Sequence, residues 1–290
     1  MKSPVLSILF LLISVTLLAV PNDFRFRHFS VEDGLSSNSV RAIMQDKYGF
    51  LWIGTEEGLN RYDGIMIKSY SICPQAAGKY ISSLYGTKKN IWIGTDEGIY
   101  IYAYATETFT YFDLTTPNNV RITSIVNHIL QDKDGNLWFS TNGQGLFRYN
   151  LSKNYLEQYE FTSAFGIVAS TMADSDNQIW ALTNQGESGV YKLNKAENKF
   201  EPFGLLYNAG NHHSQALAML EDSEQTLWLG TWECGLQKID KYTRQNHYLF
   251  TPYGRKRCNT HSFVNGICPS PTIDRIGRRA VIIQYPYRRI

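Results

Sequence analysis

The stretch that decides the fold is Gly49-Phe-Leu-Trp-Ile-Gly-Thr-Glu-Glu-Gly-Leu-Asn-Arg-Tyr62. It joins a short apolar segment around Trp52 to a Gly-containing turn and then to a second segment that ends in Tyr62. A short, continuously apolar segment predicts a strand whose two faces are both covered by neighbouring structure. The Gly in the turn suits a positive φ, which residues with a side chain resist.

This pattern occurs five times along the chain. Its tryptophans stand 40 to 48 residues apart, at Trp52, Trp92, Trp138, Trp180 and Trp228. First strands are predicted before them at Val40–Gln45, Leu84–Tyr85, Ile125–Leu130, Thr171–Ala173 and Ala216–Leu220, and outer fourth strands at Phe109–Phe112, Leu156–Tyr159 and Gln245–Phe250. Four strands per repeat, without a sustained helical period, predict an all-β propeller of four-stranded blades. The repeated tryptophans are interpreted as packing groups between blades.

A polar turn precedes the tryptophan in several repeats. Examples are Asp46-Lys-Tyr-Gly49 and Asp132-Lys-Asp-Gly135, which have the composition of a tight turn. The second is similar to the Asp-box turn of sialidases. Because such a turn recurs from blade to blade, we interpret it as part of the scaffold rather than as a catalytic group.

The two ends of the chain differ from the repeats. Residues 1–21 predict a signal peptide or signal anchor, with Lys2 followed by an apolar run. Residues 22–268 hold five blades and part of a sixth. Residues 269–290 predict an aberrant tail, because Arg275-Ile-Gly-Arg278 stands where Trp-Ile-Gly-Thr would continue the repeat. The open alternatives are a truncated or frame-shifted product and a natural cap. With truncation, Phe24–Phe29 should lack a strand partner.

The run from Phe26 to Gly64 resembles the opening of the two-component regulator propeller, the periplasmic sensor region of hybrid two-component system histidine kinases. The resemblance extends over about residues 22–268, and it implies that these blades belong to an incomplete seven-bladed ring. It implies an exported, periplasmic propeller that senses a ligand, expected to be a glycan fragment. No kinase segment is present, so we expect this chain not to be an enzyme. Full-length relatives are expected to be homodimers that cross the inner membrane.

Composition and motif searches narrow the remaining classes. The formal net charge of +2 gives no reason to expect nucleic acid as a partner. The six histidines lack zinc-binding spacings, so neither a metal nor a cofactor is predicted. The four cysteines, Cys73, Cys234, Cys258 and Cys268, show no CxxC spacing and are interpreted as incidental.

Candidate ligand-binding residues lie in the turns between second and third strands, which share one face of a propeller with the connections between blades. They are Glu56, Glu57, Asp96, Glu97, Asn142, Gln144, Asn184, Gln185, Trp232 and Glu233, together with His212 in a loop between blades. Amides and carboxylates around an aromatic ring suit a sugar, whose hydroxyls need hydrogen bonds and whose C–H faces stack on rings. Three alternatives stay open: turn residues that are polar only because turns are solvated, a propeller enzyme of the streptogramin lyase or sialidase type, and a protein-interaction scaffold.

Overall fold

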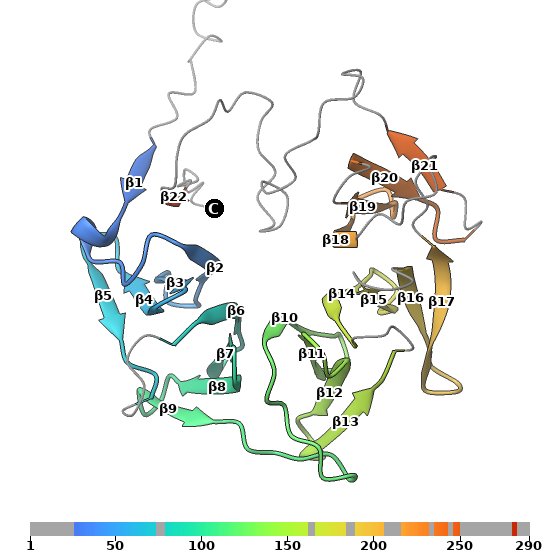
Figure 1. The fold of residues 1–290 in the computed structure, drawn as a ribbon, viewed down its shortest axis with the longest axis horizontal. Coiled ribbons are helices and arrows are strands. Elements are labelled where there is room, and N and C mark those ends of the chain that lie inside the picture. Colours follow the sequence, from blue (N-terminus) through green and yellow to red (C-terminus); the bar gives the residue numbers. More distant parts are fainter. Residues whose placement is uncertain are drawn as a thin grey trace, which may run out of the picture.

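The computed structural model describes residues 26–73, 79–161, 166–183, 189–205, 216–231, 235–242, 246–249 and 280–282. Five four-stranded antiparallel sheets lie around a common centre (Figure 1): blade 1 (β2–β5), blade 2 (β6–β9), blade 3 (β10–β13), blade 4 (β14–β17) and blade 5 (β18–β21). The described residues contain no α-helix and one short 3-10 turn, η1, at Val31–Asp33. The predicted all-β propeller of four-stranded blades is confirmed. The number of blades in a complete ring stays a prediction.

Each blade is a meander in which strands that follow one another in sequence pair side by side. The first strands lie nearest the centre (Figure 1): β2 (Val40–Gln45), β6 (Ile81–Gly86), β10 (Val126–Gln131), β14 (Val168–Ala173) and β18 (Ala216–Glu221). The second strands carry the repeated tryptophans: β3 (Leu51–Thr55), β7 (Asn90–Thr95), β11 (Leu137–Thr141), β15 (Ile179–Thr183) and β19 (Leu227–Thr231).

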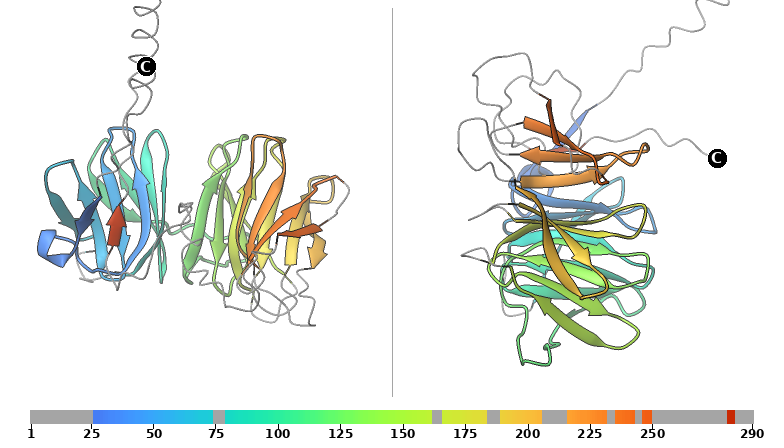
Figure 2. Two further views of the ribbon diagram at one scale, coloured as in Figure 1. Left: turned by 90° about the horizontal axis from the view of Figure 1, so that it is seen from above. Right: turned by 90° about the vertical axis from the view of Figure 1, so that its right-hand side faces the viewer.

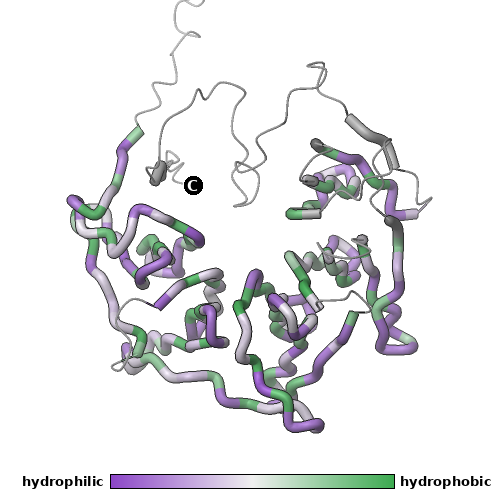
Figure 3. Tube along the Cα trace, in the orientation of Figure 1, coloured by the Kyte–Doolittle hydropathy of each residue, from purple (hydrophilic) through white to green (hydrophobic). Residues whose placement is uncertain are grey.

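The third and fourth strands complete each sheet outward. The third strands are β4 (Gly58–Tyr62), β8 (Gly98–Ala103), β12 (Leu146–Asn150), β16 (Gly189–Asn194) and β20 (Gly235–Ile239). The fourth strands are β5 (Ile67–Tyr70), β9 (Thr108–Tyr111), β13 (Tyr155–Tyr159), β17 (Lys199–Leu205) and β21 (Asn246–Leu249). Figure 2 shows that the strands run across the thickness of the disc, so the turns lie on its two faces. Figure 3 shows hydrophilic residues along the outer connections and hydrophobic residues within the sheets.

Two outer strands were missed by the sequence analysis. Strand β5 is only four residues long, and β17 contains Pro202 and Gly204, which argue against a strand. Both lie on the outer edge of a sheet, where Pro is tolerated because its missing N–H leaves no interior ladder bond unmade. A register shift between Val190 and Tyr191 accommodates the irregular outer strand of blade 4.

The repeated tryptophans pack forward onto the next blade. Trp52 lies 5.0 Å from the ring of Tyr102 in blade 2, measured between ring centroids. Trp92 clusters with residues of blade 3, Trp138 with residues of blade 4 and Trp180 with residues of blade 5. These four side chains are buried, whereas Trp228, in the last of the five described sheets, is half-buried. Their interpretation as packing groups between blades is supported by this common arrangement.

An aspartate in the turn after the first strand holds the tryptophan in most blades. Asp132 Oδ2 accepts a hydrogen bond of 2.8 Å from Trp138 Nε1, and Asp132 Oδ1 accepts one of 2.8 Å from the backbone N–H of Asn136. One carboxylate therefore fixes both the turn and the indole. The same indole–carboxylate bond, 2.6 to 3.0 Å long, joins Trp52 to Asp46, Trp180 to Asp174 and Trp228 to Asp222. These contacts support the interpretation of the turn as scaffold.

The first strands carry a second repeated device, an irregularity near their start. A register shift occurs in all five, as between Ile81 and Ser83 in β6. Such a bulge bends the strand and redirects a side chain. In blades 2 and 3 the redirected side chains reach the next blade: Ser82 Oγ donates to the Val126 carbonyl at 2.8 Å, and Asn127 Nδ2 donates to the Val168 carbonyl at 2.9 Å. The inner strands of neighbouring blades are thus tied together.

The expectation that Phe24–Phe29 lacks a partner is wrong for the part that the structure describes. Strand β1 (Arg27–Phe29) pairs antiparallel with β22 (Ala280–Ile282), which belongs to the segment that we assigned to no blade. The physical reason is that a short apolar run such as Ala280-Val-Ile282 has strand propensity even without the Trp signature. Phe29 also packs against blade 1, with Leu35, Ile53 and Tyr62. The predicted segments 1–21 and His261–Cys268 lie outside the described residues.

A buried ammonium group connects blades 4 and 5. Lys241 Nζ lies 2.8 Å from Asp176 Oδ2, 2.8 Å from Glu221 Oε1 and 3.8 Å from Asp174 Oδ2. Burial alone would lower the pKa of Lys241, but the hydrogen bonds that Lys241 donates to Asp176 and Glu221 outweigh burial and raise that pKa. The hydrogen bond from Lys241 lowers the pKa of Asp176. Burial alone would raise the pKa of Glu221, but the hydrogen bonds that it accepts from Lys241 and Ser175 outweigh burial and lower that pKa.

Replacing Asp132 by Thr should destabilise the fold. Asp132 binds the indole of Trp138 and the turn with two different oxygens, whereas Thr has a single side-chain oxygen. We expect the free energy of unfolding in urea to fall by about 2 kcal/mol, the cost of leaving a buried donor without a partner. Asp96→Thr is the control, since Asp96 is exposed in the turn between β7 and β8, and should change stability by less than about 0.5 kcal/mol. Equal effects of the two variants would contradict this account of the turn.

Replacing Lys241 by Met should leave Asp174, Asp176 and Glu221 without their cation. At neutral pH we expect the free energy of unfolding to fall by about 3 kcal/mol, while Lys153→Met in an exposed turn should have little effect. The pKa values of Asp176 and Glu221 are lowered from 3.8 and 4.5, so their stabilisation exists above those values and is lost on acidification. The free energy of unfolding should be measured in urea at neutral and at acidic pH. The difference in this free energy between the variant and the wild type should be smaller at acidic pH. A constant difference would contradict the prediction.

Candidate functional site

The predicted ligand-binding turns lie on the face that also carries the connections between blades. The backbone N–H of Glu56 bonds to the carbonyl of Ser39 at 3.1 Å, and that of Asn142 bonds to the carbonyl of Ile125 at 2.9 Å. Ser39 and Ile125 each directly precede the first strand of the same blade. The turn and the incoming connection are therefore joined, which confirms the expected layout in blades 1 and 3.

A buried threonine builds each of these turns. In blade 1, Thr55 Oγ1 accepts a hydrogen bond of 3.2 Å from the N–H of Glu57 and donates one of 3.0 Å to the carbonyl of Gly58. Thr95 in blade 2 and Thr141 in blade 3 make the corresponding contacts. The glycines that end these turns have positive φ, as predicted: 147° at Gly58, 109° at Gly98 and 78° at Gly145. The backbone is fixed in the same way while the side chains between Thr and Gly vary.

The acidic residues of this face fall into two groups. Glu56 pairs with Arg41, and Glu97 pairs with Lys79. The hydrogen bond from Arg41, followed by one from Ser39, lowers the pKa of the Glu56 carboxyl, which stays ionised. Glu57 and Asp96 are exposed and form no ion pair within the described residues. Among the described acidic residues of these turns, Glu57 and Asp96 therefore have the carboxylates that remain open to a ligand.

The two predicted residues of blade 3 have different environments. Gln144 Oε1 accepts hydrogen bonds of 2.9 Å from the N–H groups of Thr123 and Ser124, and its Nε2 donates one of 2.9 Å to the carbonyl of Arg121. Its amide is thus engaged in holding the connection from blade 2. Asn142 is exposed, so its side chain is the one that this turn offers to a ligand.

The remaining predicted residues cannot be placed on this face. Asn184, Gln185, His212, Trp232 and Glu233 lie outside the described residues. Those that the structure describes stand on turns of three successive blades, with Glu57, Asp96 and Asn142 exposed.

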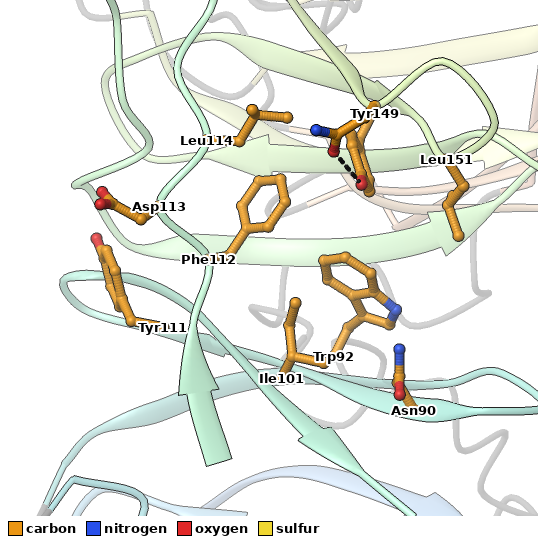
Figure 4. Close-up of a pocket in the computed structure, with 10 residues that line it drawn as sticks. Asn90, Trp92, Ile101, Tyr111, Phe112, Asp113, Leu114, Tyr149 and Leu151 are labelled. Carbon is orange, nitrogen blue, oxygen red and sulfur yellow. Dashed lines mark hydrogen bonds between the residues drawn. The ribbon is translucent and has the colours of Figure 1, made fainter. Parts of the chain in front are cut away.

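The sequence analysis missed a cavity between blades 2 and 3. Its volume is about 390 Å³, and its walls come from Asn90, Trp92, Ile101, Tyr111, Phe112, Asp113, Leu114, Tyr149, Leu151 and Asn154 (Figure 4). Sequence reasoning treated all five repeated tryptophans as equivalent. The signal that could have found this cavity is Thr87, which stands in blade 2 where the other blades have the indole-binding Asp.

Two segments of the chain, residues 34–57 and 120–143, match the family described as two component regulator propeller. They contain the first two strands of blades 1 and 3. These two segments are similar to the repeats of the two-component regulator propeller. Histidine kinase P4 of Formosa agariphila is 46% identical to this chain over 68 residues, which are 23% of this chain and 5% of that protein. This chain therefore corresponds to a small part of the length of that relative.

Solved structures with the same fold include signalling domains and enzymes. The extracellular domain of a hybrid two-component system from B. thetaiotaomicron is 25% identical, with a TM-score of 0.65, and the match covers 79% of this chain and 32% of that one. Virginiamycin B lyase from Staphylococcus aureus is 15% identical, with a TM-score of 0.63, and the match covers 81% of this chain and 77% of the lyase. At that identity the likeness to the lyase concerns the fold alone. Among the described residues, no helix has the length and apolar character needed to cross a membrane.

Truncating Gln144 should loosen the connection between blades 2 and 3, whereas truncating its neighbour Asn142 should not. We expect Gln144→Ala to lower the free energy of unfolding by about 1–2 kcal/mol, since three backbone groups lose a partner. Hydrogen exchange should also become faster at the amides of Thr123 and Ser124. Asn142→Ala is the matched control. If both variants leave exchange unchanged at those two amides, the structural role of Gln144 is wrong.

Proposed function

We propose that this chain is the extracytoplasmic, ligand-sensing propeller of a hybrid two-component signalling protein. The observation that carries the proposal is the 25% identity, over 79% of this chain, to the extracellular domain of such a system. The regulator propeller repeats and the identity to a histidine kinase support the same conclusion. The proposal includes export to the periplasm, directed by residues 1–21 as a signal peptide or signal anchor.

We infer that the ligand is a glycan fragment bound at the face that carries the turns between second and third strands. Glu57, Asp96 and Asn142 are exposed there on turns with a fixed backbone. Carboxylate and amide oxygens accept hydrogen bonds from hydroxyl groups, which suits a sugar. In the sequence, Trp232 follows the second strand of blade 5, as Glu56 follows that of blade 1. We propose that its indole stacks on a sugar ring.

Signal transfer places a further requirement on this site. A ligand changes the output of a receptor only if it binds one of two states more tightly than the other. We propose that the two states belong to a homodimer of the full-length protein, which joins the propeller to a kinase on the other side of the inner membrane. Within this proposal the propeller binds and transmits, and it performs no chemistry of its own.

Screening the purified chain against oligosaccharides should identify a ligand class. The probes are laminaritriose, xylotriose, inulotriose and an alginate trisaccharide, and the readout is the Tm. One class should raise the Tm saturably by several degrees, because a ligand that binds only the folded state adds RT ln(1 + [L]/Kd) to stability. The double variant Glu57→Ala, Asp96→Ala should keep the unliganded Tm and lose the shift, whereas Thr110→Ala on an outer strand should retain it.

Two results would contradict the proposal. If no oligosaccharide raises the Tm while the chain cleaves a streptogramin or a glycan, the protein is a propeller enzyme. If ligand binding is unchanged in the double variant, the ligand binds elsewhere on the molecule.

A further inference from the structure

Blade 2 lacks both polar partners that the other blades give to their tryptophan. In blades 1, 3, 4 and 5 an Asp accepts the hydrogen bond from the indole Nε1. In the same four blades a cation on the third strand lies over the indole, 5.3 to 5.9 Å from a ring centroid: Arg61, Arg148, Lys192 and Lys238. In blade 2 the cross-strand partner of Trp92 is Ile101, and Thr87 replaces the Asp.

The indole N–H of Trp92 is consequently buried without a partner. Trp92 is 3% exposed, and its Nε1 makes no hydrogen bond to any described residue. The hydroxyl of Thr87 is engaged elsewhere, because it donates to the carbonyl of Asn90 at 2.9 Å and accepts from the N–H of Asn90 at 3.0 Å. A buried donor without an acceptor is costly, so an acceptor that reaches Nε1 would gain that free energy.

The unpaired N–H borders the cavity between blades 2 and 3. Figure 4 shows the edge of the Trp92 indole that carries Nε1 turned toward Asn90 and Leu151, which also line the cavity. Phe112 and Tyr149 form aromatic walls beside the indole. The charged side chain in the lining, Asp113, is exposed and already pairs with Arg121 at 2.8 Å. The cavity therefore offers aromatic surface, the indole N–H of Trp92 and the side-chain amides of Asn90 and Asn154, without an unpaired charge.

The corresponding space between blades 3 and 4 shows what the missing partners normally do. That space has a volume of about 160 Å³, compared with about 390 Å³ between blades 2 and 3. Its lining includes Asp132, which binds the indole of Trp138, and Arg148, which lies over that indole. Loss of the Asp and the cation in blade 2 thus coincides with a larger and less charged cavity.

We propose that the cavity between blades 2 and 3 binds a small, neutral, mainly apolar ring compound that carries one oxygen acceptor, such as an aryl ketone. The oxygen accepts the hydrogen bond from Trp92 Nε1, and the ring packs against Phe112 and Tyr149. This site is separate from the turns on the ring face, so it does not depend on the function proposed for them.

The test uses the full chain labelled with 5-fluorotryptophan and followed by 19F NMR. Acetophenone is the probe with an acceptor, isopropylbenzene has a similar shape without one, and methyl glucoside represents sugars. Trp92→Phe assigns the resonance of Trp92. We expect acetophenone to shift that resonance saturably and to leave those of Trp52, Trp138 and Trp180 in place.

The decisive variant is Thr87→Asp, which places a carboxylate directly after the first strand of blade 2, as in the other blades, in a turn that is one residue shorter. It should raise the Tm and weaken acetophenone binding about tenfold, the equivalent of one charge-assisted hydrogen bond to the indole. Binding of isopropylbenzene should change less than about twofold, because it does not use Nε1. Thr110→Asp is the matched control, since it adds the same charge at an exposed position of the outer strand. Ile101→Arg should exclude both aromatic probes by placing a cation over the indole.

Three results would overturn the proposal. The first is that acetophenone leaves the Trp92 resonance unchanged or shifts every tryptophan equally. The second is that Thr87→Asp and Thr110→Asp have the same effect on acetophenone binding. The third is that methyl glucoside binds in place of the aromatic probes, which would show that the ligand class is wrong.

Discussion

Everything in this molecule depends on the contact between the tryptophan of one blade and the sheet that follows it. A four-stranded sheet of this size leaves two apolar faces, and neither is covered within the blade itself. Removing a Trp side chain from water buries about 150–250 Å², or roughly 4–6 kcal/mol as an upper limit. Each blade therefore stabilises its predecessor, as the packing of Trp52, Trp138 and Trp180 onto the following blades illustrates.

The polar groups around these contacts explain how the same fold can carry different surfaces. One carboxylate, such as Asp132, satisfies both the indole and the turn on one side of the blade. One hydroxyl, such as that of Thr55, fixes the turn on the other side. Because the backbone is secured by buried residues, the exposed positions between them can change without cost to the fold. The ring face is such a place, whereas the cavity beside Trp92 follows from the absence of the indole's own polar partners in blade 2.

The repeat was enough to predict the architecture, because Trp, Gly and Thr at fixed spacing each meet a local requirement of the blade. It was not enough for the outer strands of blades 1 and 4, where edge positions tolerate Pro202 and short length. Nor could it find β22, whose pairing with β1 joins residues from opposite ends of the chain. Gln144 illustrates the limit at the site: its type suits a ligand, yet its amide is engaged by the backbone of the neighbouring connection. Trp92 shows the reverse, since its sequence context resembles that of the other tryptophans while its partners are missing.

The most direct test of the central contact is hydrogen exchange at the indole N–H groups, followed by 1H–15N NMR on the folded chain. If each tryptophan is sealed by its Asp and by the next blade, the indole protons of Trp52, Trp138 and Trp180 should exchange only through opening of the blades, slower than free indole by roughly a thousandfold or more. Adding denaturant should accelerate all three. Exchange of these protons at the rate of free indole, without dependence on denaturant, would contradict the account.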